Sequence, residues 1–380
     1  MKFLHISDLH IGKRVNEFSM IEDQKYILNQ ILSIAKHHQT DAVIISGDIY
    51  DKPIPPAEAV QVFDYFLTEL ANLGKKVFAI SGNHDSAERI AFGAQLMKDR
   101  GVFVSPVYQG TITKVSLADE YGEIFLYLLP FMKPAAVRHA LKEELGEHTL
   151  ETYQEAVELV LNRIDVDKTS RNILLAHQFV TGAARCESEE MIVGGVDNIA
   201  VELFDDFDYV ALGHIHSPQS VGRDTVRYCG TPLKYSFSEA NQTKSVTIVE
   251  LKEKGQITVF AEPLKPLHDM RIVRGDYLEV TKKSFYQGSD TNDYIKVILT
   301  DEEDIPDGIQ KLRMIYPNLM RLEYDNSRTR KNKSIELVKH VELKSDMELF
   351  EEFYELQNNQ PMSKKQRDYV KQLMEEMQEG

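Results

Sequence analysis

Hydrophobic residues in the first two thirds of the chain gather in short runs, with amphipathic stretches between them. Two of these stretches, residues 24–37 and 57–73, have the spacing of helices that bury one face. The runs have the aliphatic content of strands covered on both faces, and they comprise residues 3–6, 43–45, 77–80, 173–176 and 209–212. Strands that alternate with helices predict an α/β core.

Polar residues follow each of these five runs directly. Because functional sites in α/β sheets lie at the carboxyl ends of the strands, we expect the five polar clusters to meet in one place. The clusters contain Asp8 and His10, then Asp48, then Asn83 to Asp85, then His177, and finally His214 and His216.

The pattern changes after about residue 263. Pro263 and Pro266 suggest a linker, and strand-like pieces then alternate with a helix-like piece at 306–315, which predicts a small α+β domain. Two helix capping boxes, Ser345 with Glu348 and Ser363 with Gln366, predict a helical hairpin in the last part of the chain. Its apolar faces pack either on the chain's own body or on a partner. The expected domains are residues 1–262, 263–344 and 345–380.

Composition is that of an ordinary globular protein, with 42% hydrophobic and 27% charged residues. No run approaches the roughly 18 apolar residues of a membrane span, and only two cysteines favour a reducing, cytoplasmic setting. A net charge of −16 argues against a simple nucleic-acid binder. Residues 265–344 are nearly neutral, however, and one run there is either a solvated loop or a DNA contact: Arg328, Arg330, Lys331 and Lys333.

The residue types in the polar clusters suit divalent metals, which bind carboxylate and carbonyl oxygens and imidazoles. Asp8 and His10 are alternate residues just beyond a strand, so their side chains can point to one side, and His214 and His216 repeat this spacing. Asp48 follows a glycine that permits a sharp turn. A single pair of this kind usually has a structural role. The complete set, in contrast, predicts seven metal ligands: Asp8, His10, Asp48, Asn83, His177, His214 and His216.

Two metal ions held together by a bridging ligand activate water for attack on phosphorus. Asp48 is the expected bridge, because its carboxylate has two oxygens. His84 directly follows a ligand and is expected to face elsewhere, where it binds a phosphate oxygen or protonates the leaving group. The neighbouring Asp85 is expected to orient the His84 ring and to keep it protonated.

This series of motifs resembles the calcineurin-like metallophosphoesterase superfamily. Three further stretches, Ser7 to Gly12, Gly194 to Asp197 and Tyr228 to Phe237, are similar to the nuclease subunits of SbcCD complexes, bacterial relatives of the eukaryotic double-strand-break repair nuclease. The resemblance implies a metallophosphoesterase β-sandwich flanked by helices. It also implies a small α+β domain that caps DNA and a C-terminal helical hairpin.

The resemblance further assigns roles to single residues. One metal would be held by Asp8, His10, Asp48 and His216, and the other by Asp48, Asn83, His177 and His214. His84 matches the family's catalytic histidine, and the expected metal is manganese. One departure concerns Asp51, which stands where archaeal and eukaryotic relatives carry a second histidine.

The activity implied is a 3′-to-5′ exonuclease on double-stranded DNA and an endonuclease on single strands and hairpins, acting in DNA repair, recombination and replication. The implied partner is the SbcC ATPase, whose coiled-coil base would receive residues 345–380. A homodimer within a heterotetramer would form through the helices expected at 57–73 and 87–99, where apolar residues exceed one core face: Val60, Phe63, Phe66, Leu67, Phe92 and Leu96.

Two alternatives remain. A phosphoprotein phosphatase or cyclic-nucleotide phosphodiesterase on the same scaffold is disfavoured, because protein phosphatases carry Asp-Arg-Gly where this chain has Asp51, Lys52 and Pro53. A binding scaffold that has lost catalysis is disfavoured, because every expected ligand and His84 are present.

Overall fold

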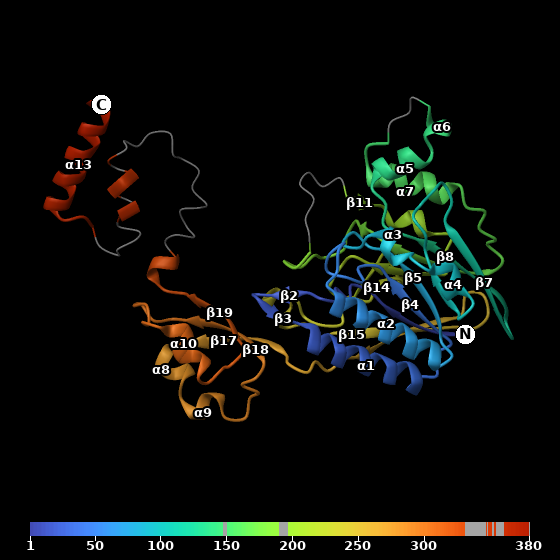
Figure 1. Ribbon diagram of the computed structural model, residues 1–380, viewed down its shortest axis with the longest axis horizontal. Coiled ribbons are helices and arrows are strands. Elements are labelled where there is room, and N and C mark those ends of the chain that lie inside the picture. Colours follow the sequence, from blue (N-terminus) through green and yellow to red (C-terminus); the bar gives the residue numbers. More distant parts are fainter. Residues whose placement is uncertain are drawn as a thin grey trace. The chain divides into compact units, whose positions relative to one another are not determined.

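A computed structural model describes two compact units, Met1–Met270 and Arg271–Gly380 (Figure 1). The residues described are 1–146, 150–189, 197–330, 347, 349–351, 353–354 and 361–379.

The first unit is built on two six-stranded sheets, which contain all five of the apolar runs as strands. In each sheet four neighbouring strands are parallel, and antiparallel pairing adds the other two, on one side of the first sheet and on both sides of the second. The first sheet has the order β16 (Ile257–Pro263), β15 (Ser245–Leu251), β1 (Lys2–Ile6), β4 (Ala42–Ser46), β5 (Lys76–Ile80) and β6 (Val102–Val104). The second has the order β13 (Gln219–Val221), β14 (Arg223–Tyr228), β12 (Tyr209–Gly213), β9 (Arg171–His177), β8 (Gly122–Leu129) and β7 (Thr113–Asp119).

Successive residues of the second sheet point into two different cores, as strand geometry requires. Ile173 and Leu175 of β9 pack against the first sheet in a cluster with Phe78. Their neighbours Leu174 and Ala176 face the opposite side and pack in a cluster with helix residues. The two sheets therefore form a sandwich, which confirms the predicted fold.

Helices cover the outer faces of this sandwich (Figure 1). Helices α5 (Pro134–Ala140) and α7 (Tyr153–Asn162) cover the second sheet through Val137, Ala156 and Val157. The described part of this unit also contains α1 (Ile21–His37), α2 (Ala57–Asn72), α3 (Ala87–Ile90), α4 (Ala94–Lys98), α6 (Lys142–Leu145), η1 (Val201–Phe204), η2 (Phe237–Glu239), and the strand pairs β2 (Arg14–Val15) with β3 (Phe18–Ser19) and β10 (Phe179–Val180) with β11 (Asn198–Ile199).

The stretches 57–73 and 87–99 expose fewer of their apolar residues than the sequence pattern predicted for a dimer interface. Phe63 and Phe66 of α2 are buried in the core of their own unit, whereas Val60, Phe92 and Leu96 are exposed. The second stretch forms two short helices, α3 and α4, in place of one.

The second unit contains the predicted α+β elements. A three-stranded sheet has the order β17, β18, β19, and Val273, Val297 and Leu312 belong to its core. The Ser363 capping box is confirmed, since Gln366 N–H donates to Ser363 Oγ (3.4 Å) and Ser363 N–H to Gln366 Oε1 (2.9 Å). The Ser345 box lies outside the described residues. The elements are β17 (Met270–Gly275), α8 (Tyr277–Val280), α9 (Lys283–Tyr286), β18 (Tyr294–Leu299), α10 (Gly308–Arg313), β19 (Leu319–Tyr324) and α13 (Lys364–Glu379).

Candidate metal centre

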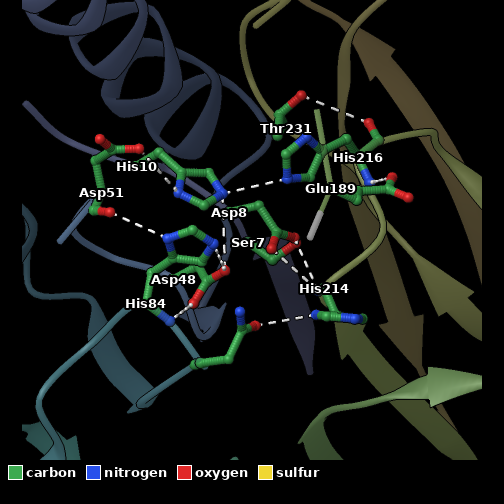
Figure 2. Close-up of polar contacts among 12 residues, drawn as sticks. Ser7, Asp8, His10, Asp48, Asp51, His84, Glu189, His214, His216 and Thr231 are labelled. Carbon is green, nitrogen blue, oxygen red and sulfur yellow. Dashed lines mark hydrogen bonds and ion pairs between the residues drawn. The ribbon is translucent and has the colours of Figure 1, made fainter. Parts of the chain in front are cut away.

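The seven candidate ligands come together at the carboxyl ends of β1, β4, β5, β9 and β12. Asp48 lies at their centre, with its Oδ2 atom 3.4 Å from His177 Nε2 and 3.7 Å from His10 Nε2. On one side, His10 Nε2 lies 3.2 Å from His216 Nε2, as Figure 2 shows. Asp8 lies on the same side. One oxygen of its carboxylate lies within 4.8 Å of an imidazole nitrogen of both His10 and His216, so the three residues can bind one ion.

Asn83 organises the other side of the cluster. Its Oδ1 atom lies 2.9 Å from His177 Nε2 and 3.0 Å from His214 Nδ1. His177 Nδ1 is held by the Ser46 carbonyl at 2.8 Å, so Nε2 is the nitrogen that faces the cluster. Oxygen and imidazole donors therefore form two adjacent groups with Asp48 between them.

The backbone adopts an uncommon conformation at four of these positions. Asp8, His10, Asp48 and His214 all have positive φ, at 53°, 44°, 49° and 100°. Few residues other than glycine adopt this region, and those that do concentrate at functional sites. The sharp turn predicted at Gly47 is confirmed by its φ of 87°.

Gly82 lets two strand ends approach each other closely. A Cβ atom at Gly82 would lie 2.1 Å from Asp48 Oδ1, nearer than real Cβ contacts come. The glycine before Asn83 therefore makes room for the central carboxylate.

Burial sets the charges of the histidines. It lowers the pKa of His214 to about 3, and it lowers the pKa of both His10 and His216 well below the ordinary value. These three imidazoles are neutral at pH 7, the form in which histidine binds a metal.

The remaining charges fit a cation at the centre of the cluster. Burial opposes ionisation of both Asp48 and His177, but their contact outweighs it: the pKa of Asp48 falls below its usual value and that of His177 rises to about 9. Burial also raises the pKa of Asp8 to about 7. A protonated His177 thus supplies the positive charge that the buried Asp48 requires, and a divalent cation bound by these donors would supply it equally well.

His84 lies beside this cluster, and its orientation has a different cause from the one expected. Its Nδ1 atom lies 3.0 Å from the backbone carbonyl of Asp51, which leaves Nε2 4.0 Å from Asp48 Oδ2. The expectation that Asp85 orients the ring is wrong. Asp85 instead accepts hydrogen bonds from the backbone N–H groups of Ile49, Tyr50 and Gly82 at 2.9–3.1 Å, and so ties the loop after β4 to the loop after β5.

Comparisons with known proteins agree with this geometry. Residues 1–218 match the calcineurin-like phosphoesterase family, and residues 266–358 match the family described as the type 5 capsule protein repressor C-terminal domain. The chain is 31% identical to the SbcD component of nuclease SbcCD from Staphylococcus epidermidis over 384 residues, which cover 98% of each chain. The chain belongs to the SbcD family. As a member of this family and of the calcineurin-like phosphoesterases, it is a metal-dependent phosphodiesterase.

Two solved structures are similar at lower identity. A dimetal phosphatase from Danio rerio is 13% identical with a TM-score of 0.44, and the match covers 69% of this chain and 96% of that one. The calcineurin-like phosphoesterase YfkN from Bacillus subtilis is 14% identical with a TM-score of 0.35, and the match covers 70% and 90%.

A buried polar network behind His216 escaped the sequence analysis. Ser188 Oγ lies 2.7 Å from His216 Nδ1 and donates to Glu239 at 2.6 Å. Glu239 is fully buried and pairs with Lys244, whose ammonium also donates to the His216 carbonyl at 2.9 Å. The network leaves His216 Nε2 facing the cluster. Glu239 and Lys244 follow closely after the family-like stretch Tyr228 to Phe237, which was the available signal.

Lys13 also escaped the sequence analysis. This residue lies beside Asp51, the position at which the chain departs from the family pattern. Its ammonium donates to Asp51 Oδ1 at 2.6 Å and lies 5.6 Å from the centre of the Tyr235 ring. The Asp51 carboxylate lies 3.8 Å from His10 Nδ1 (Figure 2). A positive group is therefore present close to the position of the missing histidine.

The basic run of the second unit is less available than its sequence suggested. Arg328 pairs with Asp304 at 2.7 Å, and Arg330 pairs with Asp325 at 2.8 Å. Lys331 and Lys333 lie outside the described residues. In the part of the chain that the structure describes, no helix has the length and apolar character needed to cross a membrane.

Proposed function

We propose that the chain is the manganese-dependent nuclease component of an SbcCD complex. It would act as a 3′-to-5′ exonuclease on double strands and as an endonuclease on single strands and hairpins. The observation that carries the proposal is the set of six donor side chains that gather around Asp48, the seventh. Asp8, His10, Asp48 and His216 would hold one ion, and Asp48, Asn83, His177 and His214 the other.

Bound divalent ions would supply an activated water and neutralise charge on the phosphoryl oxygens. The remaining tasks belong to side chains of this protein. His84, with Nδ1 held by the Asp51 carbonyl, would use Nε2 to bind a phosphate oxygen or to give a proton to the leaving oxygen. Ser188 and the Ser46 carbonyl would fix the rings of His216 and His177, so that each presents Nε2 to the site.

Membership of the SbcD family supports the other assignments that we propose. We propose three functional regions: a nuclease domain at 1–262, a DNA-capping domain at 263–344 and a hairpin at 345–380 that docks on the coiled-coil base of the SbcC ATPase. Exposed Phe353, Tyr369 and Leu373 in the described part of the hairpin region suit such docking. Assembly as a homodimer within a heterotetramer, action in the cytoplasm, and a role in DNA repair, recombination and replication complete the proposal.

Metal dependence is the first test. Labelled double-stranded, single-stranded and hairpin DNA would be incubated with the purified chain in the presence of manganese, magnesium or a chelator. We expect manganese-dependent cutting that stops with the chelator. We also expect manganese to raise the unfolding temperature, since a ligand at about 100 times its Kd stabilises by roughly 2.7 kcal/mol. Metal-loaded protein that hydrolyses bis-p-nitrophenyl phosphate but no DNA, with or without the ATPase partner, would contradict the nuclease assignment.

Lys13→Met is expected to weaken DNA binding more than it slows chemistry. We expect the Lys13 ammonium to donate a charge-assisted hydrogen bond to a DNA phosphate. Such a bond contributes about 1.5–3 kcal/mol, so its loss should raise KM roughly 10- to 100-fold and change kcat little. Steady-state kinetics on a short single strand would measure this. Lys25→Met, which removes an exposed lysine of α1 paired with Glu22 and Glu58, is the matched control. A fall in manganese affinity with unchanged KM would show that Lys13 only supports the metal site.

A further inference from the structure

A pocket of about 180 Å³ opens beside Asn83 and His214, two candidate metal ligands that contact each other at 3.0 Å. Its walls include three aromatic side chains, Phe131, Tyr153 and Phe179. Drug-sized ligands occupy pockets of roughly 300–1,000 Å³, so this one suits a smaller group such as a single planar ring system.

One polar group in the pocket has no hydrogen-bond partner. Gln178 lines the pocket and is 1% exposed, and its Nε2 atom is without a partner among the described residues. A buried amide donor of this kind is costly unless a ligand or water completes it. The backbone of Gln178 is fixed, because its carbonyl accepts a hydrogen bond from Tyr228 at 2.7 Å and because it directly follows His177 at the end of β9.

The aromatic walls are held firmly in place. The Arg185 guanidinium lies 3.5 Å from the centre of the Phe179 ring and pairs with Asp197 at 2.6 Å. The Phe131 ring packs tilted against the Tyr153 ring, with centroids 5.7 Å apart, and edge-on against the His177 ring, with centroids 6.1 Å apart. Because Asp197 is paired, its carboxylate does not dominate the charge of the pocket, and Lys133 adds a positive charge to its lining.

We propose that this pocket receives one unpaired nucleobase of the strand being cut, next to the phosphate at the metal centre. The inference rests on the proposed nuclease function and extends it to a nucleotide subsite. Aromatic side chains stack on any base. Gln178 Nε2 would donate to a ring nitrogen or carbonyl oxygen, and every base has such an acceptor on its edge. Single strands and hairpin loops offer an unpaired base directly, whereas a duplex end must first separate one pair at a cost of a few kcal/mol.

The test removes the base and the pocket in turn. A series of single-stranded oligonucleotides, each with one abasic nucleotide, is cut by the wild-type protein with manganese. We expect one position beside the cleaved bond at which the missing base slows cutting roughly tenfold, the scale of base–aromatic stacking. In Phe179→Ala, the rate of cutting of intact DNA should fall about tenfold more than the rate on DNA that is abasic at that position. Gln178→Met, which keeps the volume and removes the donor, should show the same selective loss. Phe260→Ala, on the edge strand β16, is the matched control and should change neither rate by more than about twofold.

Equal losses on intact and abasic DNA would overturn the proposal, as would an abasic series without a preferred position. A second readout does not depend on cleavage. Wild-type protein with chelator would be titrated into oligonucleotides that carry 2-aminopurine at successive positions. Fluorescence should respond most at one position, and this response should vanish in Phe179→Ala. If wild-type protein cuts no DNA, the nuclease function fails, and this binding series alone decides whether the pocket holds a base.

Discussion

Asp48→Asn is expected to abolish DNA cleavage, with a loss of about 10³-fold or more in kcat, at least the scale found when one electrostatic element of a hydrolytic site is removed. Asp48 lies between the two groups of donors, 3.4 Å from His177 and 3.7 Å from His10. Asparagine has the same shape and tolerates the positive φ of this position, so the change removes charge and one oxygen donor without new backbone strain.

Metal stoichiometry should separate this effect from misfolding. Isothermal titration of the wild-type protein with manganese is expected to show two ions, and Asp48→Asn should weaken both. Asp64→Asn on the exposed face of α2 is the matched control and should bind and cut as the wild type does. Two ions bound with unchanged affinity, together with cleavage within tenfold of the wild type, would remove Asp48 from its proposed bridging role.

His84→Ala is expected to lower kcat by about 10²- to 10⁴-fold, the contribution of a positioned proton donor, with manganese affinity nearly unchanged. The reason is position: Nε2 lies 4.0 Å from Asp48 Oδ2, beside the ligand cluster, and the Asp51 carbonyl holds Nδ1. Measuring kcat on DNA and manganese binding in the same preparation would check both parts. His37→Ala, an exposed histidine at the end of α1, is the matched control.

Two substrates can distinguish the two roles open to His84. Bis-p-nitrophenyl phosphate has a leaving group that needs no proton, whereas the DNA leaving oxygen does. A loss confined to DNA would identify His84 as the proton donor to the leaving oxygen, and an equal loss on both substrates would identify a phosphate contact. Loss of manganese binding in His84→Ala would contradict both roles.

The sandwich and the meeting of the polar clusters could be predicted because both depend on local patterns. Strands buried on both faces must be apolar throughout, so runs such as 173–176 are distinctive, and the parallel strands of each sheet bring their carboxyl ends to one edge. The task of Asp85 could not be predicted, since proximity to His84 in sequence says nothing of backbone N–H groups at Ile49 and Tyr50.

The network behind His216 is hidden for the same reason. Ser188 and Glu239 are 51 positions apart, and no local pattern shows that the partly buried Ser188 would meet the fully buried Glu239. The surplus apolar face of α2 was overestimated, because helix periodicity does not reveal how deeply Phe63 and Phe66 enter the core. Long-range packing decides both questions.

The four left-handed residues that face the centre have an evolutionary consequence. Asp8, His10, Asp48 and His214 hold conformations in which glycine would relieve strain, and such conformations cost of the order of 1–3 kcal/mol each. Selection for activity and selection for stability therefore act in opposite directions at these positions. A descendant released from catalysis would therefore gain stability by exchanging these residues for glycine.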